Sequence, residues 1–328
     1  MAQSIASGCS FDDAVDQQHL MKTTETALVA ISDARYPALL REVFDPPLVL
    51  FARGRLELMN ALLFAVVGTR RPTPYGVAAC ERLAGDLARA GLGIVSGMAR
   101  GIDTAAHKAT LAAEGDTVAV LGCGVDVVYP SENKKLAGDI AAKGLLLSEF
   151  PMGSVAFPQN FPVRNRIISG MSVGLMVVEG AQYSGSAITA KLALDQGREL
   201  FAVPGNITSK TSWGPNLLIK QGAKLVQEWN DVVTELPAEV RRRLIEAGRS
   251  RIAGEQLDLP GNTEVGTPAA ATGRWVLAKL KVDAATHLDD LLDTLEDSSP
   301  SELIAALFEL EMMGLVKQLP GKNFVKVW

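Results

Sequence analysis

Residues 63–96 read LFAVVGTRRPTPYGVAACERLAGDLARAGLGIVS, and this stretch decides the fold class of the chain. Two apolar runs, Leu63–Val67 and Leu92–Ser96, enclose a helical pattern over Tyr75–Ala90. Both runs are apolar throughout rather than alternating, which is typical of strands that are buried on both faces of a parallel sheet. The stretch therefore predicts one strand–helix–strand unit with a right-handed crossover.

The same alternation extends from about residue 61 to residue 236. Further strands are expected at Thr117–Leu121, Leu145–Ser148, Val173–Glu179, Glu199–Val203 and Ala223–Val226. Further helices are expected at Ile102–Ala113, Glu132–Ala142, Arg164–Met171, Ala187–Gln196 and Pro215–Gln221. Strands that alternate with helices in this way predict an α/β fold with a doubly wound, mainly parallel sheet that carries helices on both faces.

The flanking segments differ from this core in composition. Residues 1–26 are polar and aperiodic, so we expect a disordered or frayed tail, and residues 27–60 form a proline-containing lead-in segment that packs on the main domain, 61–253. Residues 254–273 are rich in Gly, Pro, Thr and Ala, which predicts a linker. In residues 274–328, three helical patterns precede a possible hairpin, which predicts a small winged-helix-like domain.

The composition excludes several classes of protein. The chain has 328 residues, and the 48% that are hydrophobic exclude a disordered chain. Its net charge of −5 still allows a local basic groove. Three cysteines at unrelated spacings predict neither a disulfide framework nor a zinc site, so we expect a reducing, cytoplasmic location. The acidic N-terminal region is unlike a signal peptide, and the longest apolar stretch, Ile167–Val178, is too short to span a bilayer, so no membrane partner is expected.

Several predicted strands end in glycine and polar residues, at the edge where open α/β sheets bind ligands. Glycine permits close approach of a ligand, and arginines and helix N-termini attract anions. We therefore expect an anion site formed by Gly68, Thr69, Arg70, Gly97, Arg100, Gly101, Ser184, Gly185, Ser186 and Thr189. The alternative is that these residues only make turns and helix caps. The glycine spacing matches neither a dinucleotide-binding fingerprint nor a Walker A motif, so no cofactor is expected.

The loop over residues 150–166 combines aromatic rings with arginines. This composition suits single-stranded nucleic acid, because rings stack on bases and arginines hold phosphates. The candidates are Phe157, Phe161, Arg164, Asn165 and Arg166. Phe161 alternatively anchors the loop in the core, and one of the two arginines alternatively pairs with Glu149 or Glu179.

The sequence offers no catalytic constellation and no metal-ligand cluster. Of the three histidines, only His107 falls in the main domain, and its place inside a predicted helix is typical of a packed residue rather than a general base. Asp103 is expected to cap a helix or to pair with Arg100. We therefore expect a binding protein and not an enzyme.

Ordered motifs extend along the main domain from about Tyr36 to Leu236. They read VVGTRRPTPYG, SGMARGIDTAAH, LGCGVDVVYPSENK, LSEFP, FPVRNRIISG, SGSAITA and FAVPG. With these motifs the chain closely resembles the DprA/Smf family (DNA-processing protein A), and its C-terminal region also resembles the winged-helix-like domain of that family.

The resemblance implies an extended Rossmann fold and a homodimeric, non-enzymatic protein. Such a protein binds single-stranded DNA, protects it during natural transformation and loads the RecA recombinase onto it. The site residues that the resemblance implies are Arg70, Lys134, Phe161, Arg164, Asn165, Arg166 and Ser184–Thr189. The chain departs from the family pattern at Gly180, at Ala187 and in the N-terminal helical module, which is missing or reduced to a tail, so no role of that module is carried over.

The alternative function is that of a nucleotide-binding Rossmann enzyme resembling phosphoribohydrolases. Those enzymes use a P-G-G-x-G-T-x-x-E motif, whereas residues 183–191 here contain neither Pro-Gly-Gly nor an acidic residue, which favours the binding protein.

The last predicted helix, Ser301–Met313, is acidic. It carries Glu302, Glu309 and Glu311 and no basic residue, so we do not expect it to bind duplex DNA. Its acidic face is either solvated or a surface for contact with protein.

Overall fold

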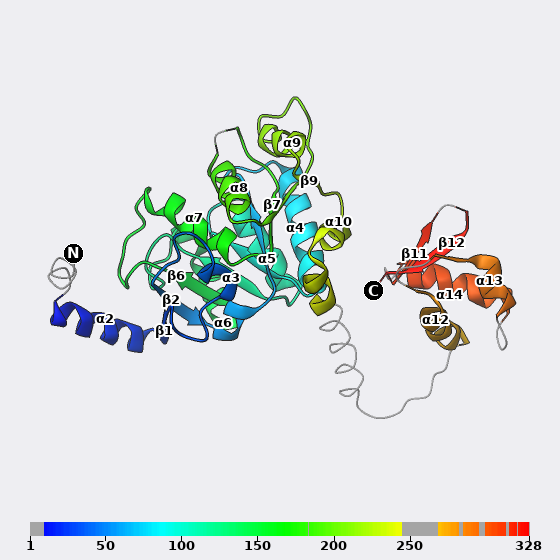
Figure 1. Cartoon of the computed structure of the whole chain (residues 1–328), viewed down its shortest axis with the longest axis horizontal. Helices are drawn as coiled ribbons and strands as arrows, with labels where there is room; N and C mark the ends of the chain where they lie inside the picture. The colour runs from blue at the N-terminus through cyan, green and yellow to red at the C-terminus, as the bar shows by residue number, and fades with distance from the viewer. Residues whose placement is uncertain are drawn as a thin grey trace. The chain divides into compact units, whose positions relative to one another are not determined.

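The structure is a computed structural model that describes residues 10–182, 184–244, 268–281, 285–294, 299–312, 315–319 and 321–327 (Figure 1). Its contacts divide the chain into two compact units, Met1–Arg249 and Ser250–Trp328. Each unit has its own sheet and its own apolar core. The predicted linker falls largely outside the described residues, and its last part, 268–273, is helical.

The described strands of the first unit form one sheet in the order β1-β2-β6-β5-β4-β3-β7-β8-β9. Their bounds are β1 Thr26–Ala30, β2 Val49–Gly54, β3 Leu63–Val67, β4 Gly93–Ser96, β5 Thr117–Val120, β6 Leu145–Ser148, β7 Gly174–Val177, β8 Glu199–Ala202 and β9 Lys224–Leu225. Neighbours from β6 to β9 are parallel, whereas β1 and β2 add an antiparallel edge. The chain moves from β3 outward to β6 and then returns to β7 on the other side of β3, which confirms the predicted doubly wound sheet.

Helices cover both faces of this sheet. Their bounds are α4 Pro74–Arg89, α5 Ile102–Ala112, α6 Lys134–Lys143, α7 Asn160–Gly170, α8 Gly185–Asp195, α9 Trp213–Lys220 and α10 Trp229–Glu235. Because right-handed crossovers in opposite directions leave their helices on opposite faces, α4, α5 and α6 lie on one face and α7, α8 and α9 on the other. In agreement, α4 packs against α5 and α7 packs against α8.

The N-terminal region corrects one prediction. Instead of a frayed tail, residues Phe11–Thr23 form helix α2, which lies beside β1 (Figure 1). The helix begins with a reciprocal capping box, in which the Asp13 N–H donates to the Ser10 hydroxyl (3.0 Å) and the Ser10 N–H donates to the Asp13 carboxylate (3.1 Å). Sequence periodicity missed α2 because it buries none of its residues.

The lead-in segment does more than pack on the main domain, because its strands β1 and β2 extend the sheet. Between them lies the short helix α3, Ala38–Arg41. The Tyr36 ring is buried beside it, and its hydroxyl donates to the Pro47 carbonyl (2.7 Å). The Arg198 guanidinium donates to the carbonyls of Leu39 and Gly170 (3.0 Å each), which links the lead-in segment to the C-terminal end of α7.

The described residues of the second unit form three helices and a three-stranded sheet in the order β10-β12-β11, which confirms the predicted winged-helix arrangement. Its elements are α12 Pro268–Lys279, β10 Thr286–His287, α13 Leu288–Asp293, α14 Pro300–Met312, β11 Val316–Leu319 and β12 Asn323–Lys326. Leu291 of α13, Leu303 and Leu307 of α14 and Phe324 of β12 meet in its core.

Candidate nucleic-acid interface

The carboxyl ends of β3 and β7 lie side by side where the strand order reverses, so the segments that follow them share one edge of the sheet. The Thr69 N–H donates to the Glu179 carbonyl (2.7 Å), and the Ile102 N–H at the start of α5 donates to the Thr69 carbonyl (3.2 Å). Gly101 has a φ of +79°, and a Cβ there would collide with the Thr69 carbonyl. This turn therefore requires glycine, and it fixes the direction in which the chain reaches Arg70.

Arg70 lies over an aromatic ring. Its guanidinium carbon is 5.4 Å from the centre of the Phe161 ring, and the guanidinium makes no hydrogen bond or ion pair with the described residues. Phe161 is partly buried, and its ring is 5.4 Å from that of Tyr129. A Cβ on Gly122 would lie 3.0 Å from the Phe161 ring, so one side of this ring rests on the backbone. Phe161 thus anchors the loop and supports Arg70 at the same time.

Tyr129 is a candidate that sequence reasoning missed. It is 42% exposed, stands beside Phe161 and follows the glycine-rich segment after β5. A sequence signal was present, because Tyr129 follows the glycine-rich end of a predicted strand, but the search for aromatic residues considered only the loop over residues 150–166. Phe157 is 51% exposed, in a loop held by the Asp126 carboxylate, which accepts from the Gly153 N–H (2.9 Å). Tyr129 and Phe157 therefore contribute exposed aromatic surface at this edge, where Tyr75 at the start of α4 and Trp213 at the start of α9 are exposed as well.

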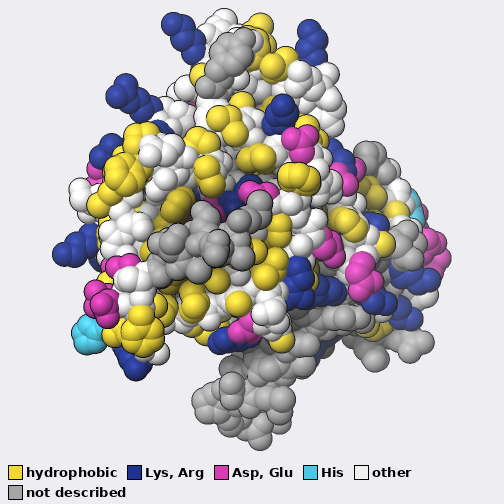
Figure 2. Space-filling model, turned by 60° about the vertical axis from the view of Figure 1, so that its left-hand side comes forward, with side chains coloured by type: hydrophobic (Ala, Val, Ile, Leu, Met, Phe, Trp, Pro, Cys, Tyr) yellow, Lys and Arg dark blue, Asp and Glu magenta, His cyan; other side chains and the backbone are white. Residues whose placement is uncertain are grey.

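The face that carries the N-terminal segment and this loop is rich in apolar side chains. Figure 2 shows such side chains spread over the face that comes forward, with basic side chains mainly toward its margins. The exposed apolar residues of these segments include Phe11, Val15, Leu48, Val155 and Phe157.

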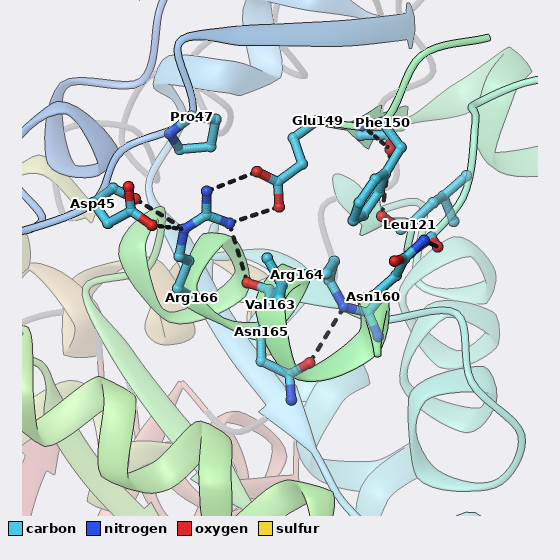
Figure 3. Close-up of polar contacts among 12 residues, drawn as sticks. Asp45, Pro47, Leu121, Glu149, Phe150, Asn160, Val163, Arg164, Asn165 and Arg166 are labelled. Atoms are coloured by element: carbon cyan, nitrogen blue, oxygen red, sulfur yellow. Dashed lines mark hydrogen bonds and ion pairs between the residues drawn. The ribbon is translucent and has the colours of Figure 1, made fainter. Parts of the chain in front are cut away.

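Arg164 points into the protein, which corrects the prediction that it contacts nucleic acid. It is 3% exposed, and its guanidinium donates to the carbonyls of Gly97 (2.8 Å) and Val120. Burial lowers the pKa of Arg164 to about 10, an effect that the nearby Asp103 carboxylate opposes. Asn165 is also buried, and its side-chain oxygen accepts from the Arg164 Nε (3.3 Å; Figure 3).

Gly97 separates Arg164 from Asp103. A Cβ at this position would lie 2.5 Å from an Arg164 guanidinium nitrogen and 2.7 Å from an Asp103 carboxylate oxygen. The Asp103 carboxylate accepts from the N–H groups of Gly97 (3.2 Å) and Ala99 (3.3 Å). Asp103 therefore caps the turn after β4, and a capping role was one of the two roles expected for it. Burial raises the pKa of Asp103, and Arg164 opposes that rise. Gly97 thus serves the buried pair rather than a ligand.

Arg166 is also engaged internally, which corrects its assignment to the interface. Its guanidinium donates to both oxygens of Glu149 (2.6 Å each) and to the Asp45 carbonyl (2.8 Å), as Figure 3 shows. The expectation of an internal pair with Glu149 is therefore confirmed, whereas Glu179 forms an ion pair with neither arginine. The pair with Glu149 joins α7 to the segment after β6, and the contact with Asp45 joins α7 to the lead-in segment.

Arg100 and Lys134 differ in how free their charges are. Arg100 donates to both carboxylate oxygens of Glu132 (2.7 Å each), so it is already neutralised on the surface, and it does not pair with Asp103 as one expectation had it. Lys134 is exposed at the first position of α6, and its ammonium group has no hydrogen-bond or ion-pair partner among the described residues. A cation at a helix N-terminus is unfavourable next to the helix dipole unless an anion binds there. Lys134 is thus free to contact a phosphate.

The start of α8 has its hydroxyl groups largely engaged. Ser184 is the N-cap, its hydroxyl accepts from the Ala187 N–H (3.4 Å), and it lies 2.7 Å from the Ser186 hydroxyl. Ser186 and Thr189 are buried, and the Thr189 hydroxyl donates to the Gly185 carbonyl (3.0 Å). Only Gly185 leaves open space around its backbone, since a Cβ there would meet nothing within 4 Å. The part of this motif that a ligand can reach is therefore its backbone.

Glu179 holds the loops of this edge together. It is 1% exposed, and its carboxylate accepts from the Thr73 N–H (2.9 Å), the Thr73 hydroxyl (2.6 Å) and the Thr211 hydroxyl (3.2 Å). Sequence reasoning had named Glu179 only as a possible partner of arginine. With its oxygens occupied, Glu179 fixes the start of α4 against the loop before α9.

His107 lies inside the main domain as a packed residue. His107 is buried in α5, where burial lowers its pKa to about 3 and its Nδ1 lies 2.7 Å from the Thr117 hydroxyl. Within the described ranges, no group of three or more His, Cys, Asp or Glu could hold a metal ion. No helix in the described part of the chain is long and apolar enough to cross a membrane.

Comparison with known proteins identifies both units. The family model for DNA recombination-mediator protein A matches residues 27–237, and the model for the DprA winged helix domain matches residues 264–322. The chain is 45% identical over 210 residues to the DNA processing protein DprA of Bacillus subtilis, which covers 64% of this chain and 71% of that protein. It is 38% identical over 295 residues to Protein Smf of Escherichia coli, which covers 90% of this chain and 76% of that protein.

Solved structures give the same assignment. The crystal structure of DNA processing protein A from Streptococcus pneumoniae matches with a TM-score of 0.64 and 42% identity, over 70% of this chain and 84% of that one. A structure of DNA processing protein A from Helicobacter pylori matches with a TM-score of 0.59 and 29% identity, over 68% of this chain and 97% of that one. That structure describes the single-stranded DNA binding mode of the Helicobacter pylori protein.

Proposed function

This chain belongs to the DNA recombination-mediator protein A family, also called DprA/Smf, and we propose that it binds single-stranded DNA at the carboxyl edge of its nine-stranded sheet. The observation that carries the proposal is the group of Arg70, Phe161 and Tyr129. An arginine with no ion-pair partner among the described residues lies over one aromatic ring, which stands beside a second, exposed ring. Cations beside aromatic surfaces are the usual means of binding single strands without regard to sequence.

Each part of the edge has a distinct role in this proposal. Arg70 and Lys134 hold successive phosphates, and the open backbone at Gly185 receives a further phosphate at the start of α8. Tyr129 and Phe157 stack on bases, because both rings are exposed, Tyr129 beside Phe161 and Phe157 in the loop before α7. The Phe161 ring packs against the guanidinium of Arg70 and keeps it oriented in the absence of DNA.

The buried and paired groups support the interface without touching DNA. Arg164 and Asp103 fix the turn after β4, and Arg166 with Glu149 fixes α7. Thr69 and Gly101 fix the turn that carries Arg70, and Glu179 fixes the loops on the other side. Arg100 contributes only if DNA displaces Glu132, which exchanges one charge-assisted contact for another.

Family membership supports two further parts of the proposal. We propose that the chain works as a homodimer in the cytoplasm, and that it protects incoming DNA during natural transformation and delivers it to the RecA recombinase. Sedimentation of the purified chain with and without RecA and a single-stranded oligonucleotide tests both. Dimers that recruit RecA to DNA agree with the proposal, and monomers that leave RecA unbound contradict it.

The enzymatic alternative has less support. A phosphoribohydrolase needs an acid that is free to act on the glycosidic bond, whereas Glu179 at the same edge already accepts hydrogen bonds from Thr73 and Thr211. Incubation with nucleoside monophosphates distinguishes the two functions. Release of free base would favour the enzyme, and its absence is expected.

The experiment that tests the binding function is a titration of the whole chain with labelled single- and double-stranded oligonucleotides over a range of salt concentrations. We expect tighter binding to the single strand and an affinity that falls steeply as salt rises, because phosphate contacts release counterions. Equal binding to duplex, or no dependence on salt, would contradict the proposal.

A further inference from the structure

Helix α2 is hydrogen-bonded to the loop that carries Phe157 through the side chain of Gln17. The Gln17 amide nitrogen donates to the Met152 carbonyl (3.2 Å), and the Met152 N–H donates to the Gln17 amide oxygen (2.8 Å). These two bonds form a reciprocal pair between residues that are 135 positions apart. Gln17 thereby satisfies both polar groups of the Met152 backbone, in the way that a neighbouring strand would.

The rest of α2 makes little contact with the body of the unit. The helix buries none of its residues, and within it only Gln17 and Met21 are even partly buried. Met21 packs against the small apolar cluster of Phe51, Val125 and Met152. The capping box at Ser10 stabilises the helix locally, so α2 does not depend on the body for its own start.

The loop needs such an attachment. Residues 151–159 have no helix or strand, and Val155 and Phe157 in it are exposed by about half. The Asp126 carboxylate holds the Gly153 N–H, and the Asn160 side chain holds the Gly122 carbonyl (3.0 Å), at the two ends of the exposed part. Gln17 holds Met152, the residue just before the first of these points.

We propose that α2 is a clasp that orders this loop for DNA binding and that Gln17 is its positioning residue. The proposal rests on the proposed function, because the loop matters only if Phe157 stacks on a base. A loop that is already ordered loses less conformational entropy when Phe157 meets a base, so DNA binds more tightly. Release of the clasp therefore weakens binding by about fivefold, which is the scale of one ordered side chain or short segment.

A double-mutant cycle tests the clasp. Single-strand affinity is measured for the wild-type chain, Gln17→Ala, Phe157→Ala and the double variant. Gln18→Ala is the matched control, because Gln18 is exposed on the same helix and its side chain makes no hydrogen bond with the described residues. We expect Gln17→Ala to weaken binding about fivefold. We expect Gln18→Ala to match the wild type and the double variant to bind like Phe157→Ala alone, since Gln17 acts through Phe157.

Amide hydrogen exchange gives the second readout. Gln17→Ala should speed exchange of the Met152 N–H while the melting temperature stays unchanged, because α2 buries no residue. Wild-type affinity in Gln17→Ala, or losses that simply add to those of Phe157→Ala, would overturn the clasp even though the wild-type chain binds DNA. If the wild-type chain binds no single-stranded DNA, the proposed function fails and the clasp's role in binding fails with it, whatever the exchange shows.

Discussion

Arg164→Met separates a structural arginine from a DNA-binding one. Methionine keeps most of the side-chain volume but removes the charge and every donor. The carbonyls of Gly97 and Val120 lose their partner, and the buried Asp103 carboxylate loses its opposite charge. Removing one member of a buried charge pair costs about 3–5 kcal/mol, which is a large part of the stability of an ordinary domain.

Urea unfolding followed by circular dichroism measures this loss. We expect the transition of Arg164→Met to move to lower urea by an amount equivalent to about 4 kcal/mol. The folded fraction at zero urea should bind single-stranded DNA within about twofold of the wild type, since Arg164 does not reach the surface. In Arg164→Met with Asp103→Asn the loss should be smaller than the sum of the two single losses, because no buried charge is left alone. A variant that unfolds like the wild type and yet fails to bind DNA would refute the assignment of Arg164 to the interior.

Three further predictions follow from the same contacts. Burial lowers the pKa of His107 to about 3, so below pH 6.5 the unfolded chain binds a proton that the folded chain does not. The free energy of unfolding should therefore fall by about 1.4 kcal/mol for each pH unit below pH 6.5. Urea unfolding between pH 6.5 and pH 5 measures this slope, which His107→Gln should lack. Tyr129→Ala should weaken single-strand binding by about 1–3 kcal/mol in a fluorescence titration while Tyr129→Phe keeps it, whereas Phe161→Ala should also lower the melting temperature because its ring is packed; loss of affinity in Tyr129→Phe would argue against stacking. A chain that ends near Gly254 should bind single-stranded DNA with similar affinity, because the second unit presents acidic residues on α13 and at the start of α14; loss of binding by a folded truncated chain would place the site partly in that unit.

The central sheet could be predicted from the sequence because its strands are apolar throughout. Buried parallel strands leave a continuous signal, and the runs at Leu63–Val67 and Leu145–Ser148 coincide with β3 and β6. The strand ends also locate the edge correctly, because the order of strands and crossovers is set by general rules.

The roles of individual charged residues could not be predicted in the same way. Arg164 and Arg166 are two positions apart in one motif, and composition gives both the same attraction for phosphate. Whether each points to solvent depends on acids far along the chain, such as Glu149 and Asp103, and on the space that Gly97 leaves. Helix α2 was not predicted for a related reason. It buries none of its residues and so leaves no apolar periodicity, and its attachment at Gln17 joins residues that are 135 positions apart.

The salt dependence of single-strand binding by Arg70→Ala tests the central claim most directly. Arg89→Ala is the matched control, because Arg89 lies in the last turn of α4, at the opposite edge of the sheet, and pairs with Asp86. We predict that Arg70→Ala weakens binding to all sequences about equally and lowers the slope of log affinity against log salt by roughly 1, whereas Arg89→Ala changes neither. An unchanged affinity and slope in Arg70→Ala would contradict the account, since the phosphate contact would then lie elsewhere on the chain.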